Sequence, residues 1–380
     1  MRGNLKRNRS PSSICMKKEF PTSYIIQVPC GTGMKPRWRR MVERSERSMP
    51  AVAPDRLVRA ILDAVVDSGA SGVLITPARS NPRCFIVTGS NFNQRLTVYA
   101  WTLTFGGRPS LANEFRIQMT SVNSPLSVST DGVTILIGYE PERELFAGFD
   151  LQMHKTFTAG SPSVQIDVEE LRRAETQGLS FHRKSNDEIA VGIRPDMFLA
   201  YALNARVLHQ HGSKANVFGL LNAIVKDDAP IQPRVEEVQA TPRQRIVSEV
   251  SRLTREASFR RQTLFAYEKR CAVTRTQLRL VEAAHILPVG APDSADHVCN
   301  GIALSPTYHR AFDAGLIYLD ENLHMRLNED RIQLLQSQHL VGGLDNFRMP
   351  LGQIFLPPDP NQRPSLDFVQ RANKFRQIGI

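Results

Sequence analysis

The hydrophobic period of this chain changes after its first helix, and this change limits the folds that the chain can adopt. The segment "DRLVRAILDAVVDSG", from Asp55, has apolar residues at helical spacing and a glycine at its end, which predicts an amphipathic helix. Short runs rich in β-branched and aromatic residues follow, separated by Gly, Pro, Asn and Ser. They are "SGVLITPA", "RCFIVTGS", "RLTVYAWTLTF", "EFRIQMTSV", "GVTILIGYE" and "LFAGFDLQM". They predict a largely β region of roughly 150 residues.

The later segments divide the chain. "SVQIDVEELRRAETQG" is predicted to pass from a strand into a helix, and "RPDMFLAYALNARVLHQ" to form another helix. The Pro- and charge-rich passage "KDDAPIQPRVEEVQATPRQR", at 226–245, is typical of a linker. We therefore predict an α+β protein with a mostly β N-terminal domain and flanking helices at 51–225, the linker, and a second domain at 246–380.

Composition limits the class of protein. A hydrophobic content of 41% and a charged content of 22% are ordinary for a soluble protein. We find no apolar run of the eighteen or so residues that a membrane helix needs, so we expect no membrane contact and a cytoplasmic location. The five cysteines are scattered and never spaced as CxxC, which argues against a disulfide framework and against a cysteine zinc site.

Residues 1–50 carry most of the net charge. They contain twelve Lys and Arg against three Glu, a net +9 of the +11 of the whole chain. This basic leader lacks the apolar core of a secretory signal. Two interpretations stay open: a disordered arm that contacts nucleic acid phosphates, or an extension upstream of a start at Met41 or Met49. The functional prediction therefore rests on the rest of the chain.

A second basic run directly precedes one histidine, His285. From Thr241 to Glu282 the chain has ten Lys and Arg and four acids, a local +6. The segment "SEVSRLTREASFRRQTLFAYEKR" within it is helical in pattern. Its charges suit a solvated helix face or a surface that binds a phosphate backbone, and the sequence leaves both interpretations open.

A short helix is predicted where two potential metal ligands occur. Ser305 and Pro306 are typical of a helix start, and Gly315 is typical of a helix end, so we expect a helix at 306–314. On a helix, residues four apart share a face, so His309 and Asp313 would present an imidazole nitrogen and a carboxylate oxygen to one divalent cation.

Two further polar residues precede this helix, and the set resembles a known family. His285 ends a short apolar run, and Asn300 follows fifteen residues later. A lone histidine is most often a hydrogen-bonded core residue. The stretch from Leu264 to Leu323, however, resembles the HNH, or ββα-metal, endonucleases, in the branch found in bacterial restriction and defence nucleases. It contains that branch's "AAHI-P" strand, "NG-AL" strand and "H-FD-G" helix in order.

This resemblance implies a ββα-metal nuclease fold for the second domain and a role for each matching residue. His285 matches the general base, and Asn300 matches the residue that holds the loop between the strands. His309 is implied as a catalytic residue and, with Asp313, as a ligand of one Mg²⁺ or Mn²⁺. The implied substrate is DNA. We expect this DNA to be double-stranded and the protein to act as a homodimer. The residues that we expect to contact DNA are Arg270, Arg279 and Arg310.

The chain departs from the family at one position. Many relatives carry an Asp or His before the base as a further ligand, and here that residue is Ala284. Glu282 could replace it, although strand alternation puts Glu282 on the face opposite His285. Two protein ligands with waters and phosphate oxygens also make a Mg²⁺ shell. A hairpin, "LIYLDENLHMRL", and a Pro-rich strap that ends in a short helix, "IFLPPDPNQRPSLDFVQRANKFR", are predicted to follow.

The N-terminal domain offers weaker signals. Arg116, Gln118, Asp150 and His154 lie where predicted strands meet turns, which suits recognition of a base or ligand, although such residues also tie down loops. We predict a restriction-type DNA endonuclease whose first domain recognises DNA, including modified DNA. Two alternatives stay open: a non-catalytic DNA-binding or regulatory protein, and an effector nuclease gated by a small signalling ligand.

Overall fold

The structure is a computed structural model that describes residues 51–89, 92–106, 113–158, 160, 162–212, 214–226 and 242–378. The predicted leader at 1–50 and residues 227–241 of the predicted linker lie outside the described residues. The described residues belong to one unit, Ser45–Ile380. We refer to residues 51–226 as the N-terminal part and to residues 242–378 as the C-terminal part.

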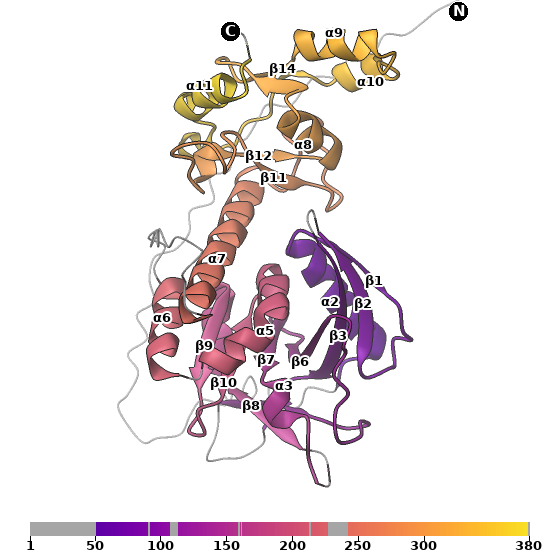
Figure 1. Cartoon of the computed structure of the whole chain (residues 1–380), viewed down its shortest axis with the longest axis vertical. Coiled ribbons are helices and arrows are strands. Elements are labelled where there is room, and N and C mark those ends of the chain that lie inside the picture. Colours follow the sequence, from indigo (N-terminus) through magenta and orange to yellow (C-terminus); the bar gives the residue numbers. More distant parts are fainter. Residues whose placement is uncertain are drawn as a thin grey trace, which may run out of the picture. The chain divides into compact units, whose positions relative to one another are not determined.

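The apolar runs of the N-terminal part build a mixed sheet (Figure 1). The strand order is β1-β2-β3-β6-β7-β10-β9, in which β3 and β6 pair in parallel and all other neighbours pair antiparallel. The strands in sheet order are β1 (Ser71–Leu74), β2 (Arg83–Thr88), β3 (Asn93–Thr102), β6 (Val133–Glu140), β7 (Leu145–Phe149), β10 (Ile189–Ile193) and β9 (Leu179–Arg183).

Strands β6, β7 and β10 of this sheet are buried on both faces, which explains why they are mostly apolar. Along β6, Ile135 and Ile137 join one apolar cluster and Leu136 joins another, as side-chain alternation requires. The first cluster includes α2 (Pro54–Asp67) and α5 (Phe198–Gly212), and the second includes residues of the small sheet β4-β5-β8 and of α4. The bounds on this side are β4 (Thr104–Phe105), β5 (Glu114–Gln118), β8 (Ser163–Asp167), α3 (Leu151–His154) and α4 (Val168–Gln177).

The C-terminal part begins with α7 (Pro242–Ala266), whose start lies inside the predicted linker. Val250 of α7 belongs to a core cluster of the N-terminal part, and Ala266 belongs to the core cluster of the C-terminal part. One helix thus contributes to both cores. The other strands and α-helices of this part are β11 (Glu282–His285), β12 (Gly301–Leu304), α8 (Pro306–Asp313), β13 (Ile317–Leu319), β14 (His324–Leu327), α9 (Glu329–Ser337), α10 (Leu344–Arg348), β15 (Gly352–Gln353) and α11 (Leu366–Phe375).

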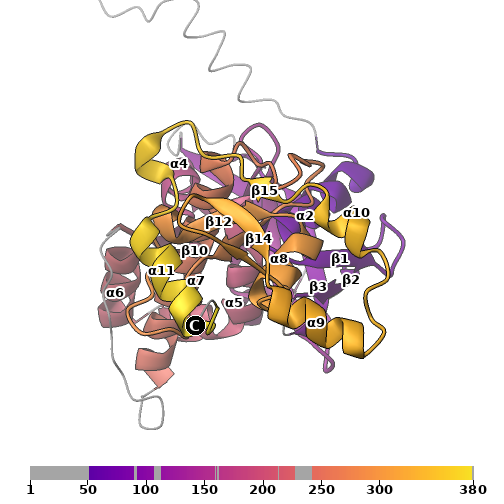
Figure 2. The ribbon, with the colours of Figure 1, turned by 90° about the horizontal axis from the view of Figure 1, so that it is seen from above.

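The strands and helices of the C-terminal part enclose one core. Viewed from above, α11 and α8 flank β12 and β14 (Figure 2). Phe312 of α8, Ile302 of β12 and Val369 of α11 are buried in the same cluster. The predicted hairpin corresponds to β13 and β14, and the predicted strap ends in α11, so these predictions are confirmed.

The predicted α+β class is also confirmed, with helices α2, α4, α5 and α7 where the sequence indicated them. Strands β9 and β10 and helix α6 (Ala215–Lys226) were not predicted. The two strands are only five residues long, and they are stabilised by their neighbours in the sheet rather than by a local pattern. Within the described residues, no helix has the length and apolar character that crossing a bilayer demands.

Candidate active site

The candidate site is built on a two-stranded hairpin and the helix that follows it. β11 and β12 pair antiparallel, with Glu282 opposite Leu304 and His285 opposite Gly301. Ser305 then occupies the N-cap position of α8 and Pro306 its first turn, as the sequence indicated. The chain therefore runs strand, strand, helix, with His285 on β11, Asn300 directly before β12, and His309 and Asp313 on α8.

Three side chains meet between β11 and α8. Nδ1 of His309 lies 2.6 Å from Oε2 of Glu282, and Nε2 of the same imidazole lies 3.3 Å from Oδ2 of Asp313. The hydrogen bond from His309 lowers the pKa of Glu282. Burial disfavours the charged imidazole, but the hydrogen bond to Glu282 and the charge of Asp313 outweigh this effect and raise the pKa of His309.

The donors of His309 and Asp313 fit a divalent cation. A cation at about 2.1 Å from each ligand in octahedral geometry holds neighbouring ligand atoms about 3 Å apart, close to the 3.3 Å between Nε2 and Oδ2. Glu282 occupies the other ring nitrogen of His309, which is where metal-binding histidines usually carry a supporting carboxylate. The residues present therefore fit one hard cation that takes its remaining ligands from water or substrate.

The protein would supply few donors to such a cation. In the described ranges, no three or more His, Cys, Asp or Glu side chains are grouped so that they could hold a metal ion. Ala284, where relatives carry a further ligand, is buried. Glu282 lies on the α8 side of β11, so it contacts His309 although it is not on the His285 face of the strand.

His285 has a different set of neighbours. Its Nε2 lies 2.9 Å from Oδ1 of Asp296, and its ring stacks on Phe259 of α7, with 3.8 Å between centroids and 13° between planes. The hydrogen bond from His285 lowers the pKa of Asp296 against the opposing effect of burial. A carboxylate at Nε2 fixes the proton on that nitrogen and leaves Nδ1, which has no hydrogen-bond partner among the described residues, as the basic atom.

Asn300 closes the loop that leads away from His285. Its side chain is fully buried, and Oδ1 accepts a hydrogen bond of 2.8 Å from the backbone nitrogen of Leu287. Nδ2 donates to the backbone oxygens of Leu287, at 3.2 Å, and Ala295, at 3.0 Å. These bonds tie both ends of the segment 287–295 together and so fix the position of Asp296 beside the imidazole.

The predicted site residues thus fall into separate groups. His309 contacts both Asp313 and Glu282, whereas His285 contacts Asp296 and Phe259. No hydrogen bond or ion pair in the described part of the chain joins the two imidazoles.

Of the three predicted DNA contacts, Arg310 lies on α8, and Arg270 and Arg279 lie between α7 and β11. Arg310 is exposed on α8. Arg270 lies 4.0 Å from Glu268. Arg279 pairs with Asp63 of α2 and is therefore engaged by the N-terminal part.

The four candidate recognition residues do not form one cluster. Arg116 and Gln118 point away from the core side of β5, which holds Phe115 and Ile117. Asp150 caps α3 by accepting a hydrogen bond from the backbone nitrogen of Gln152, at 2.8 Å. His154 lies 2.7 Å from Glu188. Asp150 and His154 therefore have structural partners, whereas Arg116 and Gln118 lie on the outer side of the small sheet.

No pattern in the sequence indicated Asp296, Phe259 or Arg376 as residues of the site. Arg376, the C-cap residue of α11, donates a 2.7 Å hydrogen bond to the backbone oxygen of Ile286, and its guanidinium lies 4.6 Å from the ring centre of Phe312. No spacing rule links these residues to His285, because their contacts depend on how α7, α11 and the loop pack together.

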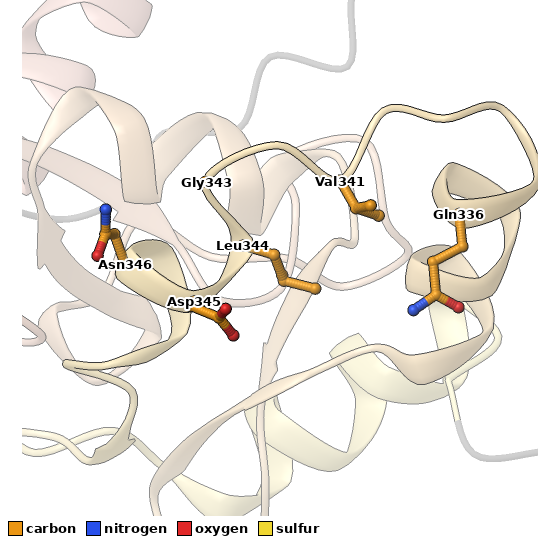
Figure 3. Close-up of a pocket in the computed structure, with 6 residues that line it drawn as sticks. All are labelled: Gln336, Val341, Gly343, Leu344, Asp345 and Asn346. Atoms are coloured by element: carbon orange, nitrogen blue, oxygen red, sulfur yellow. The ribbon is translucent and has the colours of Figure 1, made fainter.

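A hollow elsewhere in the C-terminal part lacks comparable chemistry. It lies beside α9 and α10 and is lined by Gln336, Val341, Gly343, Leu344, Asp345 and Asn346 (Figure 3). Asp345 is its one titratable lining residue, and this carboxylate pairs with Arg348. The hairpin and α8 therefore remain the candidate site.

Comparison with known proteins identifies two segments of the chain. Residues 271–320 match the family model of HNH endonucleases, and residues 94–202 match the family model described as Methylase-associated X1. The first segment contains β11, β12, α8 and all four predicted site residues. A search of curated proteins found no match.

One solved structure is similar to this chain at a low level. It is described as "Modification dependent TagI restriction endonuclease", with 11% identity and a TM-score of 0.27, over 74% of this chain and 81% of that one. A TM-score of this size does not establish a common fold.

Proposed function

We propose that this chain, which carries an HNH endonuclease domain, is a metal-dependent DNA endonuclease of restriction type. The C-terminal part would hydrolyse phosphodiester bonds, and the N-terminal part would recognise double-stranded DNA, including modified DNA. We further propose that the two parts are separate domains, divided at the linker 226–245, that the active form is a homodimer and that it acts in the cytoplasm.

The observation that carries this proposal is the paired placement of His309 and Asp313 within the segment that matches HNH endonucleases. His309 Nε2 and Asp313 Oδ2 would hold one Mg²⁺ or Mn²⁺, and Glu282 would orient His309 through Nδ1. A divalent cation bound there would supply positive charge to stabilise the phosphate during attack.

His285 would act on the attacking water. Its Nδ1 would take a proton from water, so that the oxygen attacks phosphorus and the bond to the 3′ oxygen breaks. Asp296 would hold Nε2 of the same ring and stabilise the imidazolium that forms, and Asn300 would keep the loop in place. His285 would act on the attacking water, whereas His309 and Asp313 would act on the phosphate oxygens through the cation. The two groups of residues therefore need no direct contact.

The role of the N-terminal part rests on a second observation. The Methylase-associated X1 match covers residues 94–202, which include most of the central sheet and the small sheet. A domain associated with methylases beside an endonuclease domain supports a protein that distinguishes DNA by its modification state. Arg116 and Gln118 are candidates for base contact, because both lie on the outer side of β5.

A non-catalytic alternative is favoured by one specific observation. Ala284 offers no ligand, and in the described residues no group of three metal-binding side chains forms. A DNA-binding module that has lost its cation would show both features. The two functions differ in a measurable way, since the alternative binds DNA without cutting it.

The test is cleavage of unmodified, methylated and phage-modified plasmids with Mg²⁺, Mn²⁺ or EDTA. We expect metal-dependent cutting that falls about 10²- to 10⁴-fold in His285→Ala, with DNA affinity unchanged. His297→Ala is the matched control, because His297 lies in the same loop and only accepts a hydrogen bond from the backbone nitrogen of Cys299. Equal cutting by wild type and His285→Ala would refute the assigned base, and binding without cutting on all plasmids would support the alternative.

A further inference from the structure

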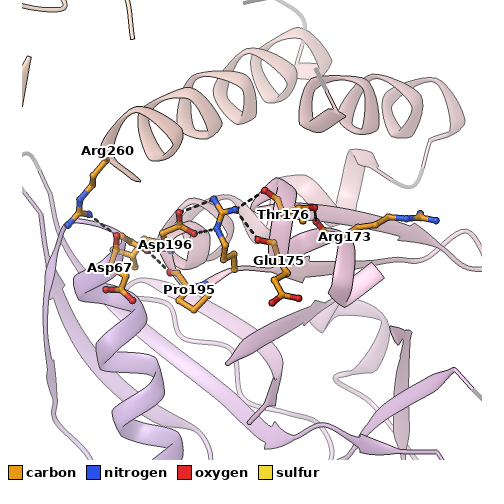
Figure 4. Close-up of polar contacts among 10 residues, drawn as sticks. Asp67, Arg173, Glu175, Thr176, Pro195, Asp196 and Arg260 are labelled. Atoms are coloured by element: carbon orange, nitrogen blue, oxygen red, sulfur yellow. Dashed lines mark hydrogen bonds and ion pairs between the residues drawn. The ribbon is translucent and has the colours of Figure 1, made fainter. Parts of the chain in front are cut away.

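Helix α7 places two consecutive residues against two different parts of the chain. Phe259 is buried, and its ring stacks on the imidazole of His285. Arg260, the next residue, donates hydrogen bonds to the backbone oxygens of Asp67, at 2.9 Å, and Val66, at 3.1 Å (Figure 4). These two oxygens end helix α2 of the N-terminal part, so a single turn of α7 contacts both the candidate base and α2.

Stacking and hydrogen bonding restrict the imidazole in complementary ways. The hydrogen bond to Asp296 fixes one atom of the ring, Nε2, but leaves the ring free to rotate about that bond. The ring of Phe259, nearly parallel to the imidazole, fixes the plane. Both contacts are needed to define the direction of Nδ1, the atom that would accept the proton.

Close packing also fixes the position of α7 against the hairpin. Gly301 lies opposite His285 in the β11–β12 register. A Cβ atom at Gly301 would come within 2.3 Å of Thr263 Oγ1 and 3.1 Å of Phe259 Cε2. The absence of a side chain at this position therefore lets α7 lie directly on the hairpin.

Arg260, on the same turn of α7, packs just as closely against the residues that follow α2. A Cβ atom at Gly69, just after α2, would lie 2.5 Å from the Arg260 guanidinium, and Gly69 has a φ of +89° that favours glycine. The guanidinium thus occupies the space beside the end of α2, where free helix carbonyls favour a cation. A movement of α2 relative to α7 must break these bonds or carry α7 with it.

We propose that Phe259 is a positioning residue for His285, and that the contact of Arg260 with α2 holds Phe259 in place and so couples the N-terminal part to the base. This inference rests on the proposed function, in which His285 is the base. Because a misplacement of about 1 Å can lower a rate about 10²-fold, a small shift of α7 is enough to switch the base on or off. Recognition of DNA by the N-terminal part then affects the cleavage rate through the position of α7.

The first experiment measures the position of the imidazole and needs no activity. In the full chain with labelled histidine, the ring signals of His285 are assigned by comparison with His285→Ala, and Phe259→Leu should remove the ring-current shift that a stacked phenyl ring produces. Arg260→Gln should move the same signals in the same direction. If Phe259→Leu leaves the signals in place, the stacking is absent, and if Arg260→Gln leaves them in place, the coupling to α2 is wrong.

The second experiment measures cleavage. Phe259→Leu should lower kcat about 10- to 100-fold with KM unchanged, Phe259→Tyr should restore most of it, and Arg260→Gln should give a smaller loss of the same kind. Phe198→Leu, in the core of the N-terminal part, is the control for a general loss of stability. An equal loss of kcat in Phe198→Leu and Phe259→Leu would overturn the positioning role.

The two experiments separate this inference from the proposed function. If no variant or wild type cuts DNA, the proposed nuclease activity fails, yet the imidazole signals still test the stacking and its link to Arg260. If wild type cuts and the signals do not respond to Arg260→Gln, the nuclease stands and the coupling falls.

Discussion

Two histidine–carboxylate pairs in this chain have nearly the same nitrogen–oxygen distance in different surroundings. In the N-terminal part, His154 lies 2.7 Å from Glu188, and in the C-terminal part, His309 lies 2.6 Å from Glu282. The two imidazoles are similarly exposed, at 22% and 23%, but the Glu188 side chain is 1% exposed and that of Glu282 is 48% exposed. The burial of the carboxylate, not the pair itself, distinguishes the two regions.

This difference determines what each pair can do. Glu188 accepts hydrogen bonds from His154 and Lys184, at 2.7 and 3.0 Å, so its oxygens are engaged inside the protein. Burial raises its pKa, but these two partners outweigh burial and lower the pKa to about 2. His309, in contrast, directs its second nitrogen to Asp313, whose side chain is 59% exposed and open to solvent ions. The pair of His154 and Glu188 therefore stabilises the fold, whereas His309 and its carboxylate partners are accessible to a cation from solvent.

The largest expected effect compares the two histidines directly. His309→Ala should lower the cleavage rate about 10³-fold, because it removes a cation ligand and with it several kcal/mol of charge stabilisation in the transition state. His154→Ala should leave the cleavage rate of the folded protein within about twofold and instead reduce stability. Plasmid cleavage and thermal unfolding of both variants test this. An equally strong loss of activity in His154→Ala and His309→Ala would contradict the different roles of the two histidines.

The second prediction concerns the two carboxylates. Glu188→Gln should lower the free energy of unfolding by about 3 kcal/mol, the value that corresponds to a shift of the pKa from 4.5 to about 2. Glu282→Gln should change it by less than about 1 kcal/mol, since an exposed pair contributes little. Urea unfolding at neutral pH measures both. Similar losses in the two variants would show that burial does not separate the pairs.

The His154–Glu188 pair also predicts how the stability of the protein depends on pH. The pKa of Glu188 is lower in the folded protein than the ordinary 4.5, so the unfolded chain binds more protons as the pH falls. The stabilisation is therefore fully present above pH 4.5 and is lost progressively towards pH 2. Wild type should lose stability in this range more steeply than Glu188→Gln. Parallel curves for the two proteins would assign the acid sensitivity to other carboxylates.

The third prediction uses the cation itself. Mg²⁺ or Mn²⁺ at about 100 times its Kd should stabilise the folded wild type by about 2.7 kcal/mol, which raises Tm, and EDTA should reverse this. Asp313→Asn should lose most of the shift, whereas Glu188→Gln should keep it, because its pair is closed to solvent ions. A shift that persists in Asp313→Asn would place the cation elsewhere.

Local rules were enough to predict the part of the site that lies on one helix. Ser305, Pro306 and Gly315 set the bounds of α8, and helical spacing alone brings His309 and Asp313 together. The same holds for β1, β2, β3, β6 and β7 of the central sheet, whose apolar runs are long enough to identify, but not for β9 and β10. These features depend on residues within about ten positions of one another, so no knowledge of packing is needed.

The rest of the site depends on tertiary packing. Asp296 reaches His285 because Asn300 closes the loop, and Phe259 reaches it because α7 packs on the hairpin over Gly301. Neither contact follows from a regular spacing of residues in the sequence. Strand alternation separated Glu282 from the face of His285. It could not show that α8 covers the Glu282 face of β11 and so brings Glu282 to His309.

The smallest expected effect tests this last contact. Glu282→Gln should weaken Mn²⁺ binding about 10- to 100-fold, because the carboxylate at Nδ1 orients the imidazole and increases its basicity. Glu268→Gln is the matched control, since Glu268 is also exposed and pairs with Arg275 rather than with a histidine. Calorimetric titration with Mn²⁺ measures both. An unchanged affinity in Glu282→Gln would mean that Glu282 only neutralises His309 when no cation is bound, and the exposed pair would then resemble the buried one more closely than its surroundings suggest.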